Sequence, residues 1–499
     1  MQSEKLIILL IITLFTTVFF SSLLLLMAGT KAAIMGGLLI PALVFSYCFP
    51  RWSILVFLIY LPLGGTITYA IAGVFKPIGG EVTYTRSYPL FHLAKDAFYF
   101  PAFFALVIGH QVWPKLRPKI KPLLIVLGIF VLLCLLTFFL VNLPQQLAGS
   151  DDKVLLMGII GLKIWLGYIP LILCGYYWIN SQKNLILLNR IFVILILISS
   201  IFCLIQYLLL INGICAGNID LPEPANTKAT LQAQCFVGGS LLYNPPQDLI
   251  RLPGTFVSPW QWSWFLVSSS FITYGAMLSE PSRVWQGISF SSIITVLIAA
   301  LISGQRTALL LVPLIYVILL LITENRKKIL LLKLGLIFGL TIIITFQLLS
   351  FGEIIGDFID RWKYSPPQEF MVNQFQWLAS DRLKWLGHGL GTTASAARSL
   401  GTIQLIEVFP VKVIYEIGIL GFLGFLAVVT TLTILTFKAY RSLKTPALSR
   451  LGLCLWLFIL FISYNPHYYP LAVDPVAVYY WFVAGMLLKL PELEEENLI

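Results

Sequence analysis

Charged residues are scarce in this sequence. Asp, Glu, Lys and Arg make up 11% of its 499 residues, whereas hydrophobic residues make up 59% and the mean hydropathy is +0.90. Because about a quarter of the residues in a soluble globular protein are charged, this composition excludes a water-soluble enzyme. It also excludes a disordered chain and a disulfide-dense secreted scaffold. No stretch of roughly 100 residues lacks long apolar runs, so we expect a polytopic membrane protein without a separate soluble domain.

The motifs of soluble catalytic domains are also missing. The sequence has no Gly-rich phosphate loop followed by Lys and Ser or Thr, no HExxH and no GxSxG. Its four histidines are scattered and form no metal-binding pair: His92, His110, His388 and His467. We therefore expect neither a metal site nor a bound cofactor.

Long apolar runs recur along the whole chain. A bilayer core about 30 Å thick requires about 20 apolar residues per helix. Divided by that length, the sequence predicts an all-α polytopic integral membrane protein with about fourteen transmembrane helices. The predicted spans are 6–27, 32–50, 53–75, 91–109, 121–142, 154–179, 186–212, 259–279, 285–304, 306–323, 328–351, 408–437, 448–464 and 476–490.

Basic residues predict the orientation, because cytoplasmic loops of membrane proteins carry an excess of Lys and Arg. With Met1 inside, the basic clusters fall in cytoplasmic connections: Lys115, Arg117, Lys119, Lys121, Arg326, Lys327, Lys328, Lys438, Arg441, Lys444 and Arg450. Both termini are then cytoplasmic, and the two longest loops lie on the outer face. The formal net charge of +11 reflects this topology, so we expect no nucleic-acid partner.

This topology divides the chain into three helical regions and two long extracytoplasmic loops. The second loop is expected to contain short amphipathic helices. In order, the regions are N-terminal helices (1–212), the first loop (213–258), central helices (259–351), the second loop (352–407), and C-terminal helices with a short cytoplasmic tail (408–499).

Cysteines are few and mostly lie in or beside apolar spans, where we expect them to pack as small hydrophobic residues: Cys48, Cys134, Cys174, Cys203 and Cys454. Cys215 and Cys235 are the only pair in an extramembrane loop, which is predicted to face an oxidising space. We expect a disulfide between them that braces the first loop. Neither has a neighbouring His or Cys at a spacing suited to zinc.

Two arginines stand at the predicted outer edge of the membrane. Arg251 lies in Arg-Leu-Pro-Gly-Thr-Phe before the span 259–279, and Arg306 lies in Ser-Gly-Gln-Arg-Thr at the break between two apolar runs. An arginine in such a place costs roughly a few kcal/mol unless it is paired or hydrated. Arg306 either extends to the surface or joins Arg251 in an anion site, since the planar guanidinium matches phosphate oxygens.

The second loop adds basic and aromatic residues on the same predicted face. Its segment 370–386 mixes Phe, Trp and Leu with polar residues, which is typical of a short helix in the plane of the membrane interface. A charged loop surface needs no ligand to explain it, although two loop-edge arginines share its face. The basic residues of the loop are Arg361, Lys363, Arg382, Lys384 and Arg398.

Three further features follow. Gly-His-Gly-Leu-Gly-Thr occupies 387–392, Glu407 precedes the span 408–437, and Glu-Ile-Gly-Ile-Leu-Gly occupies 416–421 within that span. Lys412 and Glu416 lie one helical turn apart and can pair, whereas Glu407 has no such local partner.

In this order and on this face, the features resemble the O-antigen ligase and O-antigen polymerase superfamily of bacterial membrane glycosyltransferases. The resemblance covers about 248–430 and rests on four elements. These are Arg-x-x-Gly-Thr-Phe before a helix, Ser-x-x-Arg at a helix start, Gly-x-Gly-x-Gly after a long loop, and Glu-x-Gly-Ile-Leu-Gly in the next span. A polymerase or another exopolysaccharide transferase of this superfamily fits as well as a ligase.

The resemblance implies a polyprenyl-diphosphate-linked glycan donor and a glycan or lipid acceptor, used on the outer face of the bacterial inner membrane. Arg251 and Arg306 would hold the diphosphate. In the ligases a His usually stands eleven residues before the Gly of the last element, and counting back from Gly418 gives Glu407. Glu407 would then be the catalytic base. Further candidate contacts to donor or acceptor are Arg361, Arg382, His388 and Arg398.

The residues themselves support the same chemistry. A sugar C1 bonded to diphosphate already carries a good leaving group, so arginines that neutralise the departing charge make a metal unnecessary. Attack by an acceptor hydroxyl from the opposite face would invert the anomeric centre. A carboxylate at a partly desolvated helix mouth could have the raised pKa that suits a base.

A transporter, such as a flippase for lipid-linked oligosaccharides, is the alternative. Lys95, Asp96 and Lys163 lie within apolar runs and favour it, whereas the two long outer loops disfavour it. The sequence leaves the sugar, the acceptor and the oligomeric state open.

Overall fold

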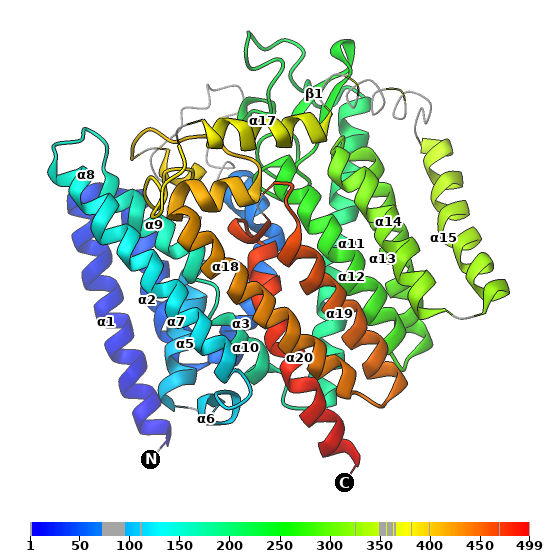
Figure 1. Cartoon of the computed structure of the whole chain (residues 1–499), viewed down its shortest axis with the longest axis horizontal. Coiled ribbons are helices and arrows are strands. Elements are labelled where there is room, and N and C mark those ends of the chain that lie inside the picture. The colour runs from blue at the N-terminus through cyan, green and yellow to red at the C-terminus, as the bar shows by residue number, and fades with distance from the viewer. Residues whose placement is uncertain are drawn as a thin grey trace. The chain divides into compact units, whose positions relative to one another are not determined.

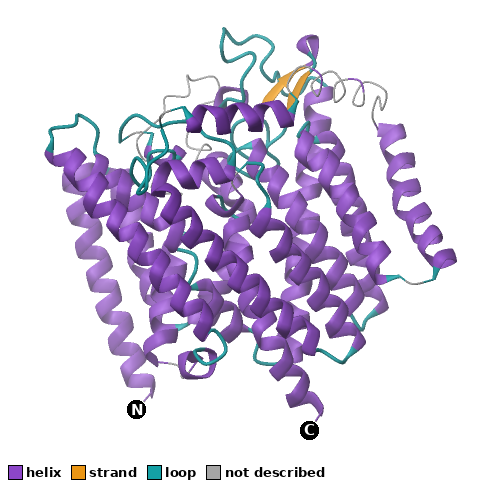
Figure 2. Cartoon of the chain, in the orientation of Figure 1, coloured by secondary structure: helices purple, strands orange, loops and turns teal. Residues whose placement is uncertain are grey.

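The computed structural model describes residues 2–71, 95–109, 112–324, 326–348, 356, 363, 366–380, 382–398, 400–468 and 470–498. Three predicted spans, 53–75, 91–109 and 328–351, fall partly outside these residues. Arg361, His92 and His110 also lie outside the described residues. Helices dominate, and the strands of the described residues form a single two-stranded sheet (Figure 2).

The chain forms two compact units, each assembled from segments that are distant in sequence. Unit 1 comprises Met1–Pro114, Ile194–Ser263 and Ile302–Gln305. Unit 2 comprises Lys115–Val193, Trp264–Leu301 and Arg306–Ile499. The boundaries between them fall within the helices α11 (Gln182–Ile211), α12 (Pro259–Ser279) and α13 (Arg283–Ile302).

Unit 1 contains the N-terminal helices and the first long loop. Its helices are α1 (Gln2–Ala28), α2 (Thr30–Cys48), α3 (Pro50–Tyr60) and α5 (Asp96–Gly109), followed by the end of α11. A 3-10 turn (Leu61–Leu63) and a π-helical segment (Thr66–Ile71) follow α3, and α6 (Val112–Leu116) begins in this unit. In the loop, β1 (Leu242–Asn244) pairs antiparallel with β2 (Leu249–Arg251), which sets Leu242 opposite Arg251.

Unit 2 is a helical bundle with two shorter helices among its loops (Figure 1). Its elements are α7 (Lys121–Thr137), a π segment (Phe138–Asn142), α8 (Leu143–Leu147), α9 (Val154–Leu166), α10 (Leu171–Trp178), α14 (Arg306–Thr323), α15 (Lys327–Leu348), α17 (Pro367–Ala379), α18 (Phe409–Ser442), α19 (Pro446–Tyr464) and α20 (Val476–Leu498), with parts of α11, α12 and α13.

Glycines let α10 and α20 pack closely at the centre of unit 2. A Cβ on Gly175 would lie 2.1 Å from the Phe482 carbonyl oxygen, and one on Gly485 would lie 2.0 Å from that of Ile172. Small residues at such contacts are typical of helix pairs in membranes, where close backbone approach supplies the packing energy.

Nine helices among the described residues are long and apolar enough to cross a membrane. This agrees with the predicted all-α membrane protein, but the predicted count of about fourteen spans is not confirmed. Three further apolar stretches among these residues are shorter: Gly36–Cys48, Pro50–Leu63 and Asp96–Gly109.

Candidate functional site

Helix α18 is broken at Gly418, whose φ of 77° and ψ of −177° are not helical. The backbone groups freed by the break bond instead to the Gly-rich loop that precedes the helix. Four hydrogen bonds join the two. The N–H group of His388 donates to the Tyr415 carbonyl (2.7 Å) and that of Gly389 to the Glu416 carbonyl (3.2 Å). The N–H group of Ile419 donates to the Lys384 carbonyl (3.2 Å) and that of Leu420 to the Trp385 carbonyl (3.4 Å). The break therefore leaves these backbone groups satisfied, as a buried segment requires.

Two glycines make this insertion sterically feasible. A Cβ on Gly418 would lie 2.1 Å from the Trp385 carbonyl oxygen, and one on Gly387 would lie 2.5 Å from backbone atoms of Glu416. Both glycines have positive φ, which other residues rarely adopt. The Gly-rich turn at 387–392 and the Glu-x-Gly element at 416–421 are thus in direct backbone contact with each other.

Buried charged groups fix the same loop. The Glu416 carboxylate accepts hydrogen bonds from Trp165 Nε1 (2.8 Å), the Gly391 N–H (3.1 Å), the Thr393 N–H (3.0 Å) and the Thr393 hydroxyl. Lys412, also buried, donates to the Thr393 carbonyl at 3.0 Å. The sequence suggests that Lys412 and Glu416 can pair with each other, and in the structure both hold the loop. A buried carboxylate is stable only with such donors.

Asn142 holds the loop from the opposite side. It lies in the π segment after α7, and its amide donates to the Leu390 carbonyl (3.0 Å) while its oxygen accepts from the Leu390 N–H (2.9 Å). Gly391 packs so closely on α9 that a Cβ there would lie 1.9 Å from the Met157 carbonyl oxygen. The loop is therefore fixed on three helices: α7 with its π extension, α9 and α18.

The predicted interfacial helix is present but shorter than 370–386. The helix α17 ends at Ala379 and lies across the end of α18 (Figure 1). The Arg382 guanidinium turns back onto it, donating to the Trp377 carbonyl at 3.2 Å and lying 4.6 Å from the Trp377 ring. A basic side chain that bonds the last carbonyls ends the helix there, so the prediction was wrong for 380 and for 382–386.

The start of α18 is attached to α17. Gln374 Oε1 accepts hydrogen bonds from the N–H groups of Glu407 (3.1 Å) and Val408 (2.9 Å). An apolar cluster of Leu378, Ile406, Val408 and Val411 packs below this contact. Glu407 therefore lies at the mouth of α18 under an amphipathic helix, and its side chain is partly buried.

His388 belongs to an aromatic stack rather than to a cluster of acids. Its ring lies 4.2 Å from that of Tyr415 and nearly parallel to it, and Trp377 contacts the same tyrosine. Burial lowers the pKa of His388 below its ordinary value, and the positive charges of Lys384 and Arg382 lower it further. At neutral pH we therefore expect His388 to be an uncharged member of the stack.

His467, which the sequence did not single out, lies beside Glu407. It follows α19, and the backbone of Val408 bridges to His467 and Tyr468 while the Phe409 N–H donates to the Pro466 carbonyl at 2.9 Å. Burial lowers the pKa of His467, and the nearby charge of Arg306 lowers it further. The mouth of α18, the loop after α19 and the first residue of α14 thus come together around His467.

Little in the sequence could have found His467. It stands 60 residues after Glu407, so no motif spacing connects the two. The one available signal was the predicted topology, which puts the short connection 465–475 on the same face as the two long loops.

The structure places the other predicted residues separately. Arg306 is the first residue of α14 and is partly buried, whereas Arg398 is exposed after a 3-10 turn. Arg251 is exposed at the end of β2 and belongs to unit 1, so it is not in the unit that holds Arg306, Glu407 and His467. Within unit 1, the Leu252 N–H donates to the Ser303 carbonyl at 3.0 Å, three residues before Arg306 in the chain.

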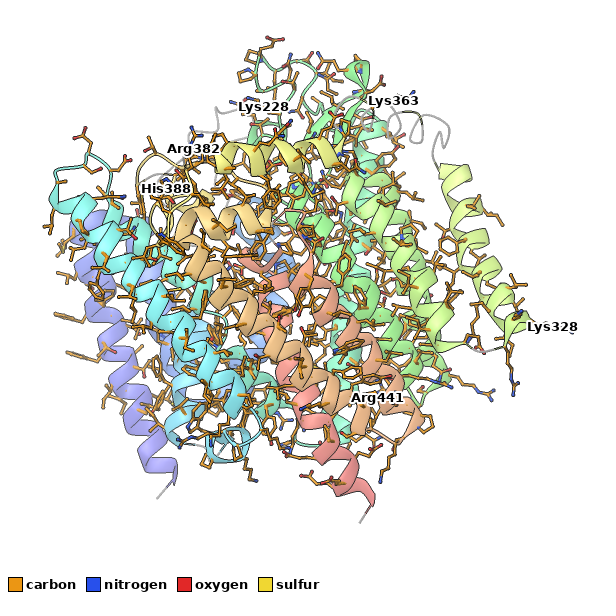
Figure 3. All side chains as sticks on the ribbon, in the orientation of Figure 1. Lys228, Lys328, Lys363, Arg382, His388 and Arg441 are labelled. Carbon is orange, nitrogen blue, oxygen red and sulfur yellow. A yellow bond between two sulfur atoms is a disulfide. The ribbon has the colours of Figure 1, made fainter. Side chains whose placement is uncertain are left out.

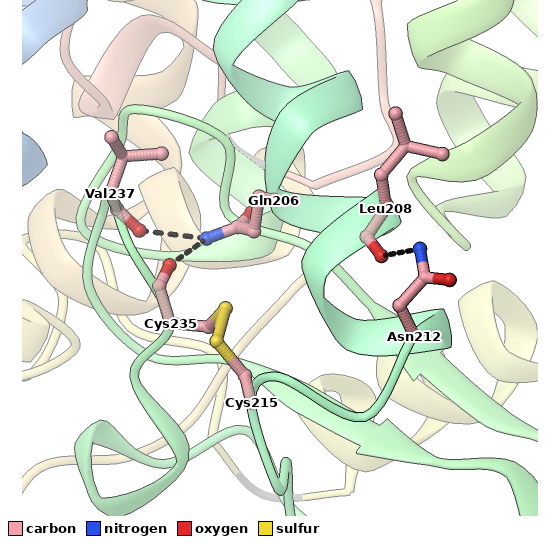
Figure 4. The surroundings of a disulfide bond; sticks show 6 residues. All are labelled: Gln206, Leu208, Asn212, Cys215, Cys235 and Val237. Atoms are coloured by element: carbon pink, nitrogen blue, oxygen red, sulfur yellow. Dashed lines mark hydrogen bonds between the residues drawn. A yellow bond between two sulfur atoms is a disulfide. The ribbon is translucent and has the colours of Figure 1, made fainter.

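Cys215 and Cys235 form the disulfide predicted from the sequence (Figure 4). The amide of Gln206, from α11, donates to the carbonyls of Cys235 (3.0 Å) and Val237 (2.7 Å) beside it. The first loop is therefore fixed both to itself and to the helix that precedes it.

The comparisons with known proteins add no family. The sequence matches no model of a known protein family, and no curated protein matches it. Within the described residues, no group of three or more His, Cys, Asp or Glu side chains is placed to hold a metal ion. The chemistry of the site must be argued from Arg306, Glu407, His467 and their surroundings.

Proposed function

We propose that this protein is a membrane glycosyltransferase that moves a glycan from a polyprenyl-diphosphate carrier to an acceptor hydroxyl. One observation carries the proposal: a helix-initial arginine, a carboxylate and an imidazole stand at one end of unit 2, as Arg306, Glu407 and His467. A departing diphosphate needs a cation, and an attacking hydroxyl needs a proton acceptor. The site offers both kinds of group.

The orientation of this site follows from α18. The helix has 34 residues, with Glu407 before its start and Arg441 in its last turn. Its part after the break at Gly418, residues 419–442, is about 36 Å long at 1.5 Å per residue, which still exceeds the 30 Å of a bilayer core. Arg382 and His388 lie at one end of unit 2, and Lys328 and Arg441 lie at the other (Figure 3). The excess of Lys and Arg at the second end favours a cytoplasmic location for it, and so an outer location for the site.

A lipid-linked donor suits such a site. Its isoprenoid tail would lie in the bilayer, and its diphosphate would meet Arg306 at the N-terminus of α14, where the helix dipole also favours an anion. The acceptor oxygen would bond to the sugar C1, the bond from C1 to the diphosphate would break, and its electron pair would leave with the diphosphate. The sequence points to Glu407 as the group that takes the hydroxyl proton.

The family resemblance supports the same reaction and leaves ligase, polymerase and other polysaccharide transferases as candidates. It also names Arg251 as the second diphosphate contact. That assignment rests on the Arg-x-x-Gly-Thr-Phe motif alone, since Arg251 belongs to unit 1. A bacterial inner membrane is the location that this resemblance implies.

The test is transfer by the purified protein in lipid vesicles. Given a polyprenyl-diphosphate glycan and a hydroxyl acceptor, it should release free polyprenyl diphosphate and glycosylated acceptor, both measured by mass spectrometry. Arg306→Lys keeps the charge but loses the planar fork, so the rate should fall about 100-fold. Arg283→Lys is the matched control, because Arg283 is an exposed arginine that also begins a helix. A normal rate for Arg306→Lys would remove the diphosphate assignment.

A transporter is the second candidate, and the break in α18 at Gly418 favours it. Transporters often bind substrates at discontinuous helices. Here, however, the loop 384–389 bonds to the backbone groups that the break frees. The same vesicles distinguish the two functions: without an acceptor, a flippase should move a labelled lipid-linked glycan between leaflets and leave its diphosphate bond intact.

A further inference from the structure

The turn that carries His467 is held in a strained conformation. Tyr468 has a φ of 51°, which is unusual for a bulky aromatic residue and is a strained conformation. The His467 ring packs against the Tyr468 ring with centroids 4.6 Å apart. The backbone bridges to Val408 hold this turn against the mouth of α18. The strained residue and the bridges together place His467 at the mouth of α18.

The His467 imidazole is also incompletely bonded. Its Nδ1 atom is buried and has no hydrogen-bond partner among the described residues. Buried polar atoms are nearly always paired, so an exception calls for an explanation. The Arg306 charge lies close by, and together with burial it keeps the ring neutral at physiological pH. A neutral imidazole has an unprotonated nitrogen that can accept a proton.

We infer that His467, rather than Glu407, accepts the proton from the acceptor hydroxyl. This inference rests on the proposed glycosyl transfer. As the acceptor oxygen bonds to the sugar C1, its proton passes to the unprotonated ring nitrogen of His467. The bond from C1 to the diphosphate breaks, and its electron pair leaves with the diphosphate beside Arg306. Because the imidazole is already neutral, its free nitrogen can accept the proton directly, which suits His467 to this step.

The experiment compares His467→Asn, His467→Ala, His467→Gln and Glu407→Gln in the vesicle assay. The three His467 variants should lower kcat at least about 100-fold while the KM for the donor stays unchanged, because the proton acceptor does not hold the diphosphate. Glu407→Gln should lower the rate less than the three His467 variants do, because the imidazole is still present to accept the proton. Added imidazole should restore part of the rate to His467→Ala, because the removed ring leaves space for it. Arg306→Ala plus imidazole is the matched control and should show no recovery.

The outcomes distinguish a failure of the proposed function from a failure of the role inferred for His467. If the wild-type protein releases no polyprenyl diphosphate with any donor and acceptor, the proposed function is wrong and the inference fails with it. If the wild-type protein transfers and the His467 variants keep its rate, or Glu407→Gln alone abolishes transfer, only the inference is overturned. Recovery of His467→Ala by imidazole would also show that this variant folds, and loss without recovery in all three variants would assign His467 a structural role.

Discussion

Among the described residues, the two long loops of this protein are fixed by different means. The first loop, 213–258 in unit 1, is held by the disulfide between Cys215 and Cys235, by a short hairpin and by Gln206. The described residues of the second loop that follow α17, 382–398 and 400–407 in unit 2, are held without a covalent bond. Buried side chains of Asn142 and Glu416 and the broken backbone of α18 bind its peptide groups.

The difference lies in where each loop finds its partners. The cysteines of the first loop are 20 residues apart, and Gln206 lies in the helix directly before them. The second loop depends on Asn142 and Trp165, which lie about 250 residues from the groups they bind or support. The disulfide and Gln206 therefore fix part of the first loop from nearby in the chain, although its end also bonds to distant residues, from Leu252 to Ser303 and from Thr255 to Pro62. The contacts of the second loop form only once α7, α9 and α18 have packed. The candidate site includes Glu407, which belongs to the second loop.

Removal of the Glu416 carboxylate should have the largest effect. Glu416→Ala leaves four donors without their acceptor inside unit 2, and loss of one member of a buried charged network costs about 3–5 kcal/mol. We expect a lower unfolding temperature in detergent and rapid proteolysis within 387–398. Glu369→Ala is the control, because Glu369 is an exposed acid in the first turn of α17. Equal stability of the two variants would show that Glu416 does not fix the loop.

A methyl group at the break in α18 should come next. In Gly418→Ala the Cβ would lie 2.1 Å from the Trp385 carbonyl oxygen at a φ of 77°, so the loop must move away. Overpacking and left-handed strain together predict a loss of about 3–4 kcal/mol in the free energy of unfolding. Gly149→Ala shares the positive φ but has open space around its Cβ, and should lose only about 1–2 kcal/mol. If the two substitutions cost the same, the close approach is not important for stability.

Loss of the disulfide should affect the first loop alone. The paired substitutions Cys215→Ser and Cys235→Ser open a loop of 20 residues, for which chain entropy predicts about 3 kcal/mol. Proteolysis should increase within 213–258 and stay unchanged within 387–398. Reduction of the wild-type protein with dithiothreitol should reproduce the pattern. Increased cleavage of both loops would contradict the separation between them.

The sequence predicted features that depend on composition or on local chemistry. Apolar runs gave the helical membrane fold, and the placement of Cys215 and Cys235 in a single loop gave the disulfide. The predicted count of about fourteen spans is not confirmed, since nine helices of the described residues are long and apolar enough, and the predicted spans 53–75 and 91–109 lie partly outside those residues.

The site was predicted only in part, because its geometry is a tertiary property. Two motifs, at 387–392 and 416–421, were found separately, and nothing in their spacing indicated that the first inserts into the second. His467 was missed for the same reason, since its bridge to Val408 crosses 59 residues of chain. Arg382 was read as a candidate ligand contact, and in the structure it ends α17.

The smallest expected effect concerns the attachment of the second loop to the residues before α9, and it depends on pH. The Asp152 carboxylate accepts hydrogen bonds from the side chain and the backbone N–H of Thr402, and these hold the pKa of Asp152 below its ordinary value. A lowered pKa in the folded state means that the attachment is stabilised above the unfolded pKa of about 4 and weakens as pH falls through the folded value.

Hydrogen exchange of the Thr402 amide should therefore be faster in Asp152→Asn than in the wild-type protein at pH 7, and the two should converge well below pH 4. Comparison at each pH cancels the intrinsic exchange rate, and Asp151→Asn controls for the loss of one negative charge at this turn. A difference that persists unchanged in acid would mean that the Thr402 bonds do not depend on the charge of Asp152, and that this part of the second loop is held by its backbone contacts alone.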